Sequence, residues 1–141
     1  MARKRNINIV MEPFKRISVA VAVIINSSNK VLLSKRAEHL HQGGKWEFAG
    51  GKVEKGETAE QALLRECKEE LAIDVVSCKL LKEIDFDYPD MQVKLIVFEV
   101  SGYTGEPVSN EGQEIAWVSL SDLHQYDFPA ANESILEMIV C

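Results

Sequence analysis

Three glutamates, Glu66, Glu69 and Glu70, are spaced so that a helix would bring their carboxylates onto one face. Positions i, i+3 and i+4 lie beside one another on a helix surface, because each residue turns the chain by about 100°. Three like charges on one face repel one another, and a hard divalent cation with oxygen ligands would compensate for that repulsion. The spacing alone is typical of a solvated charged face, with a magnesium-type metal site as the alternative.

The residues that precede this helix favour the metal site over the solvated face. Gly50 and Gly51 allow the backbone to approach a ligand closely and to adopt conformations that other residues avoid. Glu57 stands just before the expected start of the helix, and Arg65 directly precedes the first of the clustered glutamates. The acidic face is thus accompanied by a glycine turn and by two further charged residues at defined positions.

Together these residues resemble the signature of the Nudix hydrolase family, G-x5-E-x7-R-E-U-x-E-E-x-G-U, in which U is apolar. Five residues separate Gly51 from Glu57, seven separate Glu57 from Arg65, and the stretch 65–73 then reads RECKEELAI. Every charged position of the signature is present. Cys67 fills an apolar position, and Ala72 replaces the usual glycine. An alanine in a left-handed conformation at that position would cost roughly 1 kcal/mol.

The resemblance implies an α/β/α sandwich (an α+β fold with a mixed sheet) and a Mg²⁺ cofactor, for which Mn²⁺ could substitute. It implies metal binding by Glu66, Glu69 and Glu70 with the Gly50 carbonyl, and a catalytic role for Arg65. Gly51 and Glu57 would brace the helix together with Arg65. A metal neutralises a polyphosphate and lowers the pKa of the attacking water, and a nearby carboxylate accepts the proton. Glu66 is the first candidate for that base, with Glu69 as another.

The similarity to the family continues from about Ile17 to the C-terminus. The stretches 34–37 (SKRA), 46–48 (WEF), 105–107 (GEP), 111–113 (EGQ) and 127–133 (DFPAANE) resemble Nudix hydrolases that act on 8-oxo-dGTP. By this resemblance Glu111 is an additional metal ligand or alternative base, and Arg36 is a phosphate contact. Phe48 is a wall of the base pocket, and Asn132 reads the purine. Their respective alternatives are a solvated acid, a surface cation, a core aromatic and a helix cap.

The amide of Asn132 suits an oxidised guanine. One amide can accept a hydrogen bond from N7–H of 8-oxoguanine and donate one to O6. Guanine has acceptors at both positions, and an unsatisfied buried polar group costs about 1–3 kcal/mol. We therefore expect hydrolysis of 8-oxo-dGTP to 8-oxo-dGMP and pyrophosphate, which would remove a mutagenic nucleotide from the pool. A pyrophosphohydrolase for CTP, dCTP or methylated dCTP and a non-catalytic Nudix-like nucleotide-binding module remain as alternatives.

Composition sets the class of protein and of partner. The chain has 141 residues, of which 46% are hydrophobic and 27% charged, so we expect one globular domain. A net charge of −6 argues against stable binding to nucleic acid. No apolar run is long enough for a membrane span or a signal peptide. We expect a cytoplasmic monomer or weak dimer that binds a nucleoside triphosphate. The cysteines form no C-x-x-C pair, and the histidines lie in stretches expected to be exposed, so zinc is not indicated.

The apolar patterns and turn residues predict the elements that would hold this site. Residues 1–16 are expected to form an N-terminal extension, possibly flexible, and residues 17–141 a single Nudix domain. The domain would contain a helix over 58–71, begun by a capping box of Thr58 and Gln61, and a terminal helix over 132–140 capped by Asn132. The expected strands cover 17–25, 31–34, 80–88, 93–100 and 115–118, and 46–49 is a short apolar piece that ends at Gly50 and Gly51. This order predicts a mixed sheet with helices packed against it.

Overall fold

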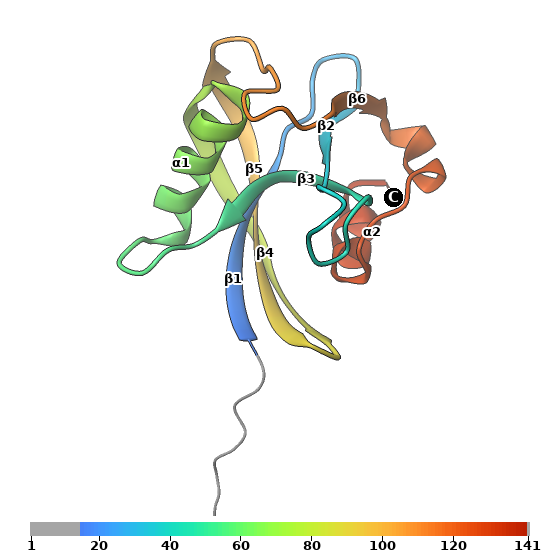
Figure 1. The fold of residues 1–141 in the computed structure, drawn as a ribbon. Coiled ribbons are helices and arrows are strands. Elements are labelled where there is room, and N and C mark those ends of the chain that lie inside the picture. Colours follow the sequence, from blue (N-terminus) through green and yellow to red (C-terminus); the bar gives the residue numbers. More distant parts are fainter. Residues whose placement is uncertain (1–14, 141) are drawn as a thin grey trace, which may run out of the picture.

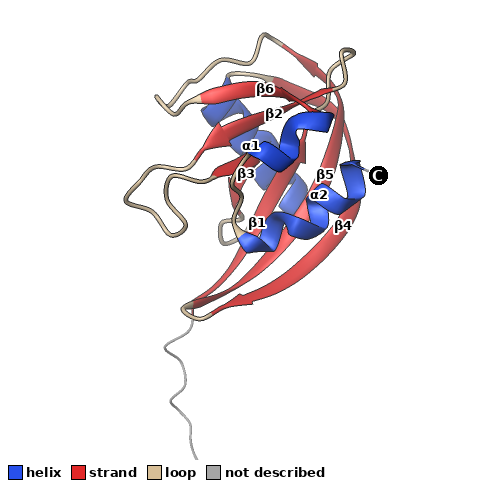
Figure 2. Ribbon diagram, turned by 90° about the vertical axis from the view of Figure 1, so that its right-hand side faces the viewer, coloured by secondary structure: helices blue, strands red, loops and turns tan. Residues whose placement is uncertain are grey.

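A six-stranded mixed sheet with helices on both faces forms the centre of the molecule (Figures 1 and 2). The computed structural model describes residues 15–140. The strand order is β4-β5-β1-β3-β2-β6. Strands β1 (Lys15–Val23) and β5 (Met91–Thr104) are parallel, and the other neighbouring strands are antiparallel. The predicted α/β/α arrangement with a mixed sheet is confirmed.

The five predicted strands and both predicted helices occur, with some differences in length, and the short apolar piece at 46–49 is the beginning of a sixth strand, β3. The remaining elements are β2 (Lys30–Lys35), β3 (Trp46–Lys52), α1 (Ala59–Leu71), β4 (Asp74–Tyr88), β6 (Ile115–Ser119), η2 (Leu120–Gln125), η3 (Ala130–Asn132) and α2 (Glu133–Val140). Strand β4 begins six residues before the predicted position, 80, because it is an edge strand whose first half is mostly exposed and lacks an apolar pattern. The long β4–β5 hairpin extends with β1 beyond the rest of the sheet (Figures 1 and 2).

Strand β1 is apolar throughout because both of its faces are covered. Val21 and Val23 belong to the core on the α2 side of the sheet, whereas Ala20 and Ala22 belong to the core on the α1 side. Alternate residues of a strand point to opposite faces, so a strand between two layers needs apolar residues at every position.

Helix α1 begins and ends as its sequence predicts. The Thr58 hydroxyl accepts from the Gln61 N–H at 3.1 Å, and the Gln61 side chain accepts from the Thr58 N–H at 2.9 Å, which completes the capping box. The helix ends at Ala72, which is left-handed (φ 60°, ψ 33°) and donates its N–H to the Lys68 carbonyl at 3.0 Å. The buried side chains Ala62, Leu63, Cys67 and Leu71 set the rotation of the helix about its axis.

Three expectations are corrected or fall partly outside the described residues. Asn132 ends the 3-10 turn η3, which leads directly into α2, so it does not cap the helix from a loop. His41 is not exposed: its ring packs edge-on against Tyr88, with 4.7 Å between ring centroids, and its Nδ1 lies 3.2 Å from Asp90. Most of the expected extension, 1–16, lies outside the described range.

No helix within residues 15–140 is long and apolar enough to cross a membrane.

Candidate metal and nucleotide site

Helix α1 packs against β3, where two glycines leave room for the acidic side chains. Gly51 lies directly against the Glu66 carboxylate, and a side chain at position 51 would overlap it. Gly50 is left-handed (φ 135°) and donates its N–H to Glu70 Oε1 at 3.0 Å. A Cβ at Gly50 would also collide with the Ala20 carbonyl on the neighbouring strand. Close contacts therefore require glycine at both positions. At Gly51 the contact is with the Glu66 carboxylate, and at Gly50 it is with the neighbouring strand β1.

Arg65 connects the helix to the loop before it. Its Nε lies 2.6 Å from Glu57 Oε2 and its Nη2 lies 2.9 Å from Glu57 Oε1, so the pair is bidentate. The same guanidinium donates to the Lys52 carbonyl, to Glu66 at 2.9 Å and to Glu69 at 3.3 Å. The hydrogen bonds from Arg65 hold the pKa of Glu57 at about 2. The predicted pair of Arg65 and Glu57 is thus present and extends to two of the clustered glutamates.

The acidic cluster carries more negative charge than its surroundings compensate. Burial, together with the charges of Glu47, Glu66 and Glu111, raises the pKa of Glu70 to about 8, against the hydrogen bond from Gly50. Burial likewise raises the pKa of Glu66, although Arg65 opposes the shift. Carboxylate oxygens crowded in this way are the donor set of a hard divalent cation. The residues therefore fit a Mg²⁺ or Mn²⁺ ion.

The carboxylates are gathered but not yet arranged around one point. Within residues 15–140, no three acidic, histidine or cysteine side chains meet at metal-ligand geometry. Glu66 is turned toward Arg65, and Glu70 toward the Gly50 N–H. Binding of a cation therefore requires side-chain rotation, for which the energetic drive is the repulsion among these acids.

Glu111 reaches the cluster from the loop 105–114, which connects β5 to β6. Asn110 and Gln113, on either side of it, donate to the carbonyls of Glu69 and Glu70, so the loop brings Glu111 to the end of α1, where its charge raises the pKa of Glu66 and Glu70. The next residue, Gly112, has a φ of 84°, which reverses the chain at this point. The structure thus places Glu66, Glu69 and Glu70 on helix α1 and Glu111 on the loop attached to the end of that helix.

A cavity of about 380 Å³ opens beside this cluster on the α2 side of the sheet. Arg36, Phe48 and Asn132, the three predicted substrate contacts, all line it, together with Gly50 and Gly51. The Phe48 ring stacks on Phe128, with centroids 5.6 Å apart and planes at 27°. Asn132 is only 8% exposed, and its amide nitrogen donates to the Pro129 carbonyl at 3.4 Å. One cavity therefore meets the acidic cluster at the glycine turn.

Sequence reasoning missed Glu47 and Tyr88, which also line the cavity. The Arg36 guanidinium donates to Glu47 Oε1 at 2.8 Å and to the His41 carbonyl at 2.8 Å. Burial raises the pKa of Glu47, and the charge of Glu66 adds to the shift. The Tyr88 hydroxyl accepts from the Ala131 N–H at 2.9 Å and so fixes the turn before Asn132. The sequence signal for Glu47 was its position as a single acidic residue between the aromatic residues Trp46 and Phe48.

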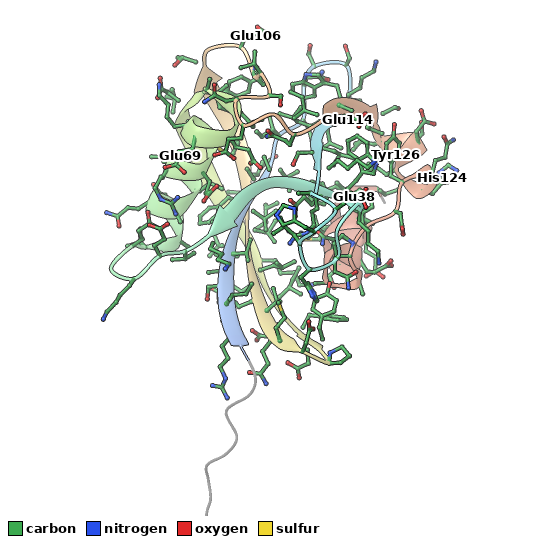
Figure 3. The ribbon with its side chains drawn as sticks, viewed as in Figure 1. Glu38, Glu69, Glu106, Glu114, His124 and Tyr126 are labelled. Atoms are coloured by element: carbon green, nitrogen blue, oxygen red, sulfur yellow. The ribbon has the colours of Figure 1, made fainter. Side chains whose placement is uncertain are left out.

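The labelled side chains in Figure 3 separate the site from the rest of the surface. Glu69 lies on α1, whereas His124, on η2, and Tyr126, directly after η2, lie at the opposite side of the molecule (Figure 3). His124 is therefore remote from the acidic cluster.

Comparison with known proteins identifies the family. Residues 20–138 match the family model described as the NUDIX domain. The chain belongs to the Nudix hydrolase family. The 8-oxo-dGTP diphosphatase of Escherichia coli K12 is 39% identical over 86% of this chain and 95% of that protein. A CTP pyrophosphohydrolase from the same strain is 35% identical over 83% of this chain and 87% of that protein.

The fold is shared with a solved Nudix structure. A structure of MutT, from work on the Aliivibrio salmonicida and Vibrio cholerae proteins, matches with a TM-score of 0.76 at 37% identity. The match covers 89% of this chain and 98% of that chain. Nearly the whole described structure of this Nudix hydrolase is therefore the family fold.

Proposed function

We propose that this Nudix hydrolase is a Mg²⁺-dependent pyrophosphohydrolase that converts 8-oxo-dGTP to 8-oxo-dGMP and pyrophosphate. The observation that supports this most strongly is the meeting of two half-sites at Gly50 and Gly51. One half is a cavity with aromatic and amide walls, suited to a base, and the other is a carboxylate cluster, suited to a metal–phosphate group. Three bacterial relatives named 8-oxo-dGTP diphosphatase are 36–43% identical to this chain.

The proposed ligands of the cation are the four clustered glutamates and the Gly50 carbonyl. A bound Mg²⁺, or Mn²⁺ in its place, would neutralise the triphosphate and lower the pKa of the attacking water. Glu66 is the proposed base that accepts a proton from that water as it attacks the β-phosphorus. Arg65, held by Glu57, orients Glu66 and Glu69 through its hydrogen bonds. The proposed ligands belong to one chain, so a monomer would carry a complete site.

The assignment of the base is tested by Glu66→Gln. Loss of a general base lowers turnover by about 10²- to 10⁴-fold, and the amide keeps the size of the side chain. We expect kcat for 8-oxo-dGTP to fall by that factor in steady-state assays with Mg²⁺. Glu69→Gln and Glu111→Gln are the matched variants. Turnover that survives Glu66→Gln but is lost in Glu111→Gln would move the role of base to Glu111.

Asn132 is the proposed reader of the oxidised base. Its amide accepts from N7–H and donates to O6 of 8-oxoguanine, whereas guanine leaves the amide oxygen facing a lone pair. Asn132 is almost fully buried, so an unpaired amide oxygen there carries a penalty. The preference for the oxidised base therefore depends on this side chain.

A panel of nucleotides tests the substrate. We expect release of pyrophosphate from 8-oxo-dGTP in preference to dGTP, CTP, dCTP and methylated dCTP. Asn132→Ala is expected to reduce the ratio of kcat/KM for 8-oxo-dGTP over dGTP by about 5- to 150-fold, the equivalent of the 1–3 kcal/mol for an unpaired buried group. Asn29→Gly removes an amide from a left-handed turn residue outside the cavity and is the control. Absence of turnover with 8-oxo-dGTP would refute the proposed substrate.

The similarity to a CTP pyrophosphohydrolase supports one alternative substrate. If CTP or dCTP were the substrate, Asn132→Ala would change turnover little, because a cytosine has no N7 and O6 pair for the amide to read. The same panel therefore distinguishes the two. A non-catalytic binding module is disfavoured, because every charged residue of the Nudix signature is retained.

A further inference from the structure

The C-terminal end of α1 is completed by a distant loop. A helix leaves its last four carbonyl groups without partners inside the helix. In α1 these carbonyls belong to residues 68–71, which include the proposed ligands Glu69 and Glu70. The carbonyl of Lys68 accepts from the Ala72 N–H. The other three accept from residues of the loop 105–114, which carries Glu111.

Three residues of the loop make these contacts. The Val108 N–H donates to the Leu71 carbonyl at 3.0 Å, and the Asn110 N–H donates to the Glu70 carbonyl at 3.0 Å. The Asn110 side-chain amide donates to the Glu69 carbonyl at 2.9 Å. The Gln113 side-chain amide donates to the Glu70 carbonyl at 3.3 Å.

Asn110 and Gln113 stand on either side of Glu111 and attach the loop to the backbone of the proposed metal ligands. Asn110 contacts two consecutive carbonyls, those of Glu69 and Glu70, so its register along the helix is fixed. Gln113 also accepts from the Glu111 N–H through its side-chain oxygen at 3.3 Å. The backbone of Glu111 is thus held from both sides.

Electrostatics alone would not place Glu111 here. The side chain of Glu111 is exposed, and its charge interacts unfavourably with those of Glu66 and Glu70. A carboxylate on a loop without attachments would move away from two like charges into solvent. The hydrogen bonds to the end of α1 oppose that movement.

We propose that Asn110 and Gln113 are positioning residues, which fix Glu111 against α1 so that its carboxylate enters the same cation site as Glu66, Glu69 and Glu70. The inference rests on the proposed metal-dependent function. It differs from simple helix capping, because capping would stabilise α1 without changing the affinity for a cation.

The test measures the affinity of the full chain for Mn²⁺ by electron paramagnetic resonance. The stability of each variant toward urea is measured in parallel. We expect Asn110→Ala and Gln113→Met each to weaken Mn²⁺ binding, and the double variant to weaken it by about 10- to 100-fold, as removal of outer partners of metal ligands does. Glu111→Gln should have a similar effect. In the Glu111→Gln background the two substitutions should change Mn²⁺ affinity no further.

Thr58→Ala is the matched control, because it removes a cap from the other end of the same helix. It should lower stability toward urea without changing Mn²⁺ affinity. The proposal is overturned if Asn110→Ala and Gln113→Met resemble this control, with lower stability and unaltered Mn²⁺ binding. A wild-type protein that releases no pyrophosphate from any nucleotide, while the variants still lose Mn²⁺ affinity, would refute the proposed function and leave the positioning role supported.

Discussion

At the scale of single residues, Ala72 shows a local cost that the fold tolerates. The residue is left-handed, a conformation in which the Cβ of an L-residue lies too close to its own carbonyl. The conformation is nevertheless required, because the Ala72 N–H closes the last turn of α1 and Ile73 then enters the core. The surrounding contacts therefore hold a residue where glycine would be unstrained.

Ala72→Gly is expected to stabilise the protein by about 0.5–1 kcal/mol, since relief of the strain outweighs the greater freedom of glycine in the unfolded chain. Urea denaturation with an unchanged m-value measures the effect. Ala62→Gly, inside α1, is the control and should destabilise the protein by about 1 kcal/mol or more. A loss of stability in Ala72→Gly would show that the left-handed alanine is not strained.

Residue identities predicted those parts of the site that depend on short spacings. The bidentate pair of Arg65 and Glu57 and the capping box could be predicted because their partners lie within one helix or its entry loop. The contact of Glu47 with Arg36 and that of His41 with Asp90 could not. Both depend on which strands and loops lie side by side, and this is fixed by the whole sheet.

At the scale of elements, the loop 53–57 and helix α1 behave as one unit. Glu57 accepts from Arg65 on the helix and from the Glu54 N–H in the loop. Since Arg65 also donates to the Lys52 carbonyl at the end of β3, a single guanidinium joins strand, loop and helix. This unit sets the distance between the glycine turn and the acidic face.

The brace predicts a pH dependence of stability. The pKa of Glu57 is lowered from 4.5 to about 2 in the folded state, so its ionised form stabilises the protein above about pH 4.5. This contribution is lost as the pH falls from about 4.5 to about 2. Hence the difference in unfolding free energy between wild type and Glu57→Gln should be constant from pH 5 to 7 and shrink below pH 4.5.

Denaturant titrations over this pH series measure the difference. In an Arg65→Leu background, Glu57→Gln should produce a much smaller pH-dependent part, because only the Glu54 N–H still lowers the pKa of Glu57. A difference that stays the same down to pH 2 would show that the ion pair does not stabilise the folded state.

Element types were predictable, but some of their ends were not. The start of β4 lies in an exposed edge strand whose residues alternate weakly. The turn η3 before α2 depends on the Tyr88 hydroxyl, which holds the Ala131 N–H from a distant strand. Asn132 therefore lies at the cavity because of tertiary contacts, although its helix-cap propensity alone suggested a different role.

At the scale of the whole molecule, the sheet brings two half-sites together at one strand. Strand β3 has α1 on one side and the cavity on the other, so its glycine turn contacts both the acidic cluster and the base pocket. The resemblance to the family predicted both halves from the sequence. Their meeting at β3 required the sheet order, which brings β3 between β1 and β2.

The central claim is that the glutamates of α1 and Glu111 hold a divalent cation beside the glycine turn. Anomalous diffraction at the manganese edge, from crystals saturated with Mn²⁺, tests it most directly. We expect one or more peaks at coordination distance from Glu66, Glu69, Glu70 and Glu111, with the Gly50 carbonyl as a further ligand. Carboxylates that remain turned to solvent at saturating Mn²⁺, with no anomalous peak beside them, would contradict the account.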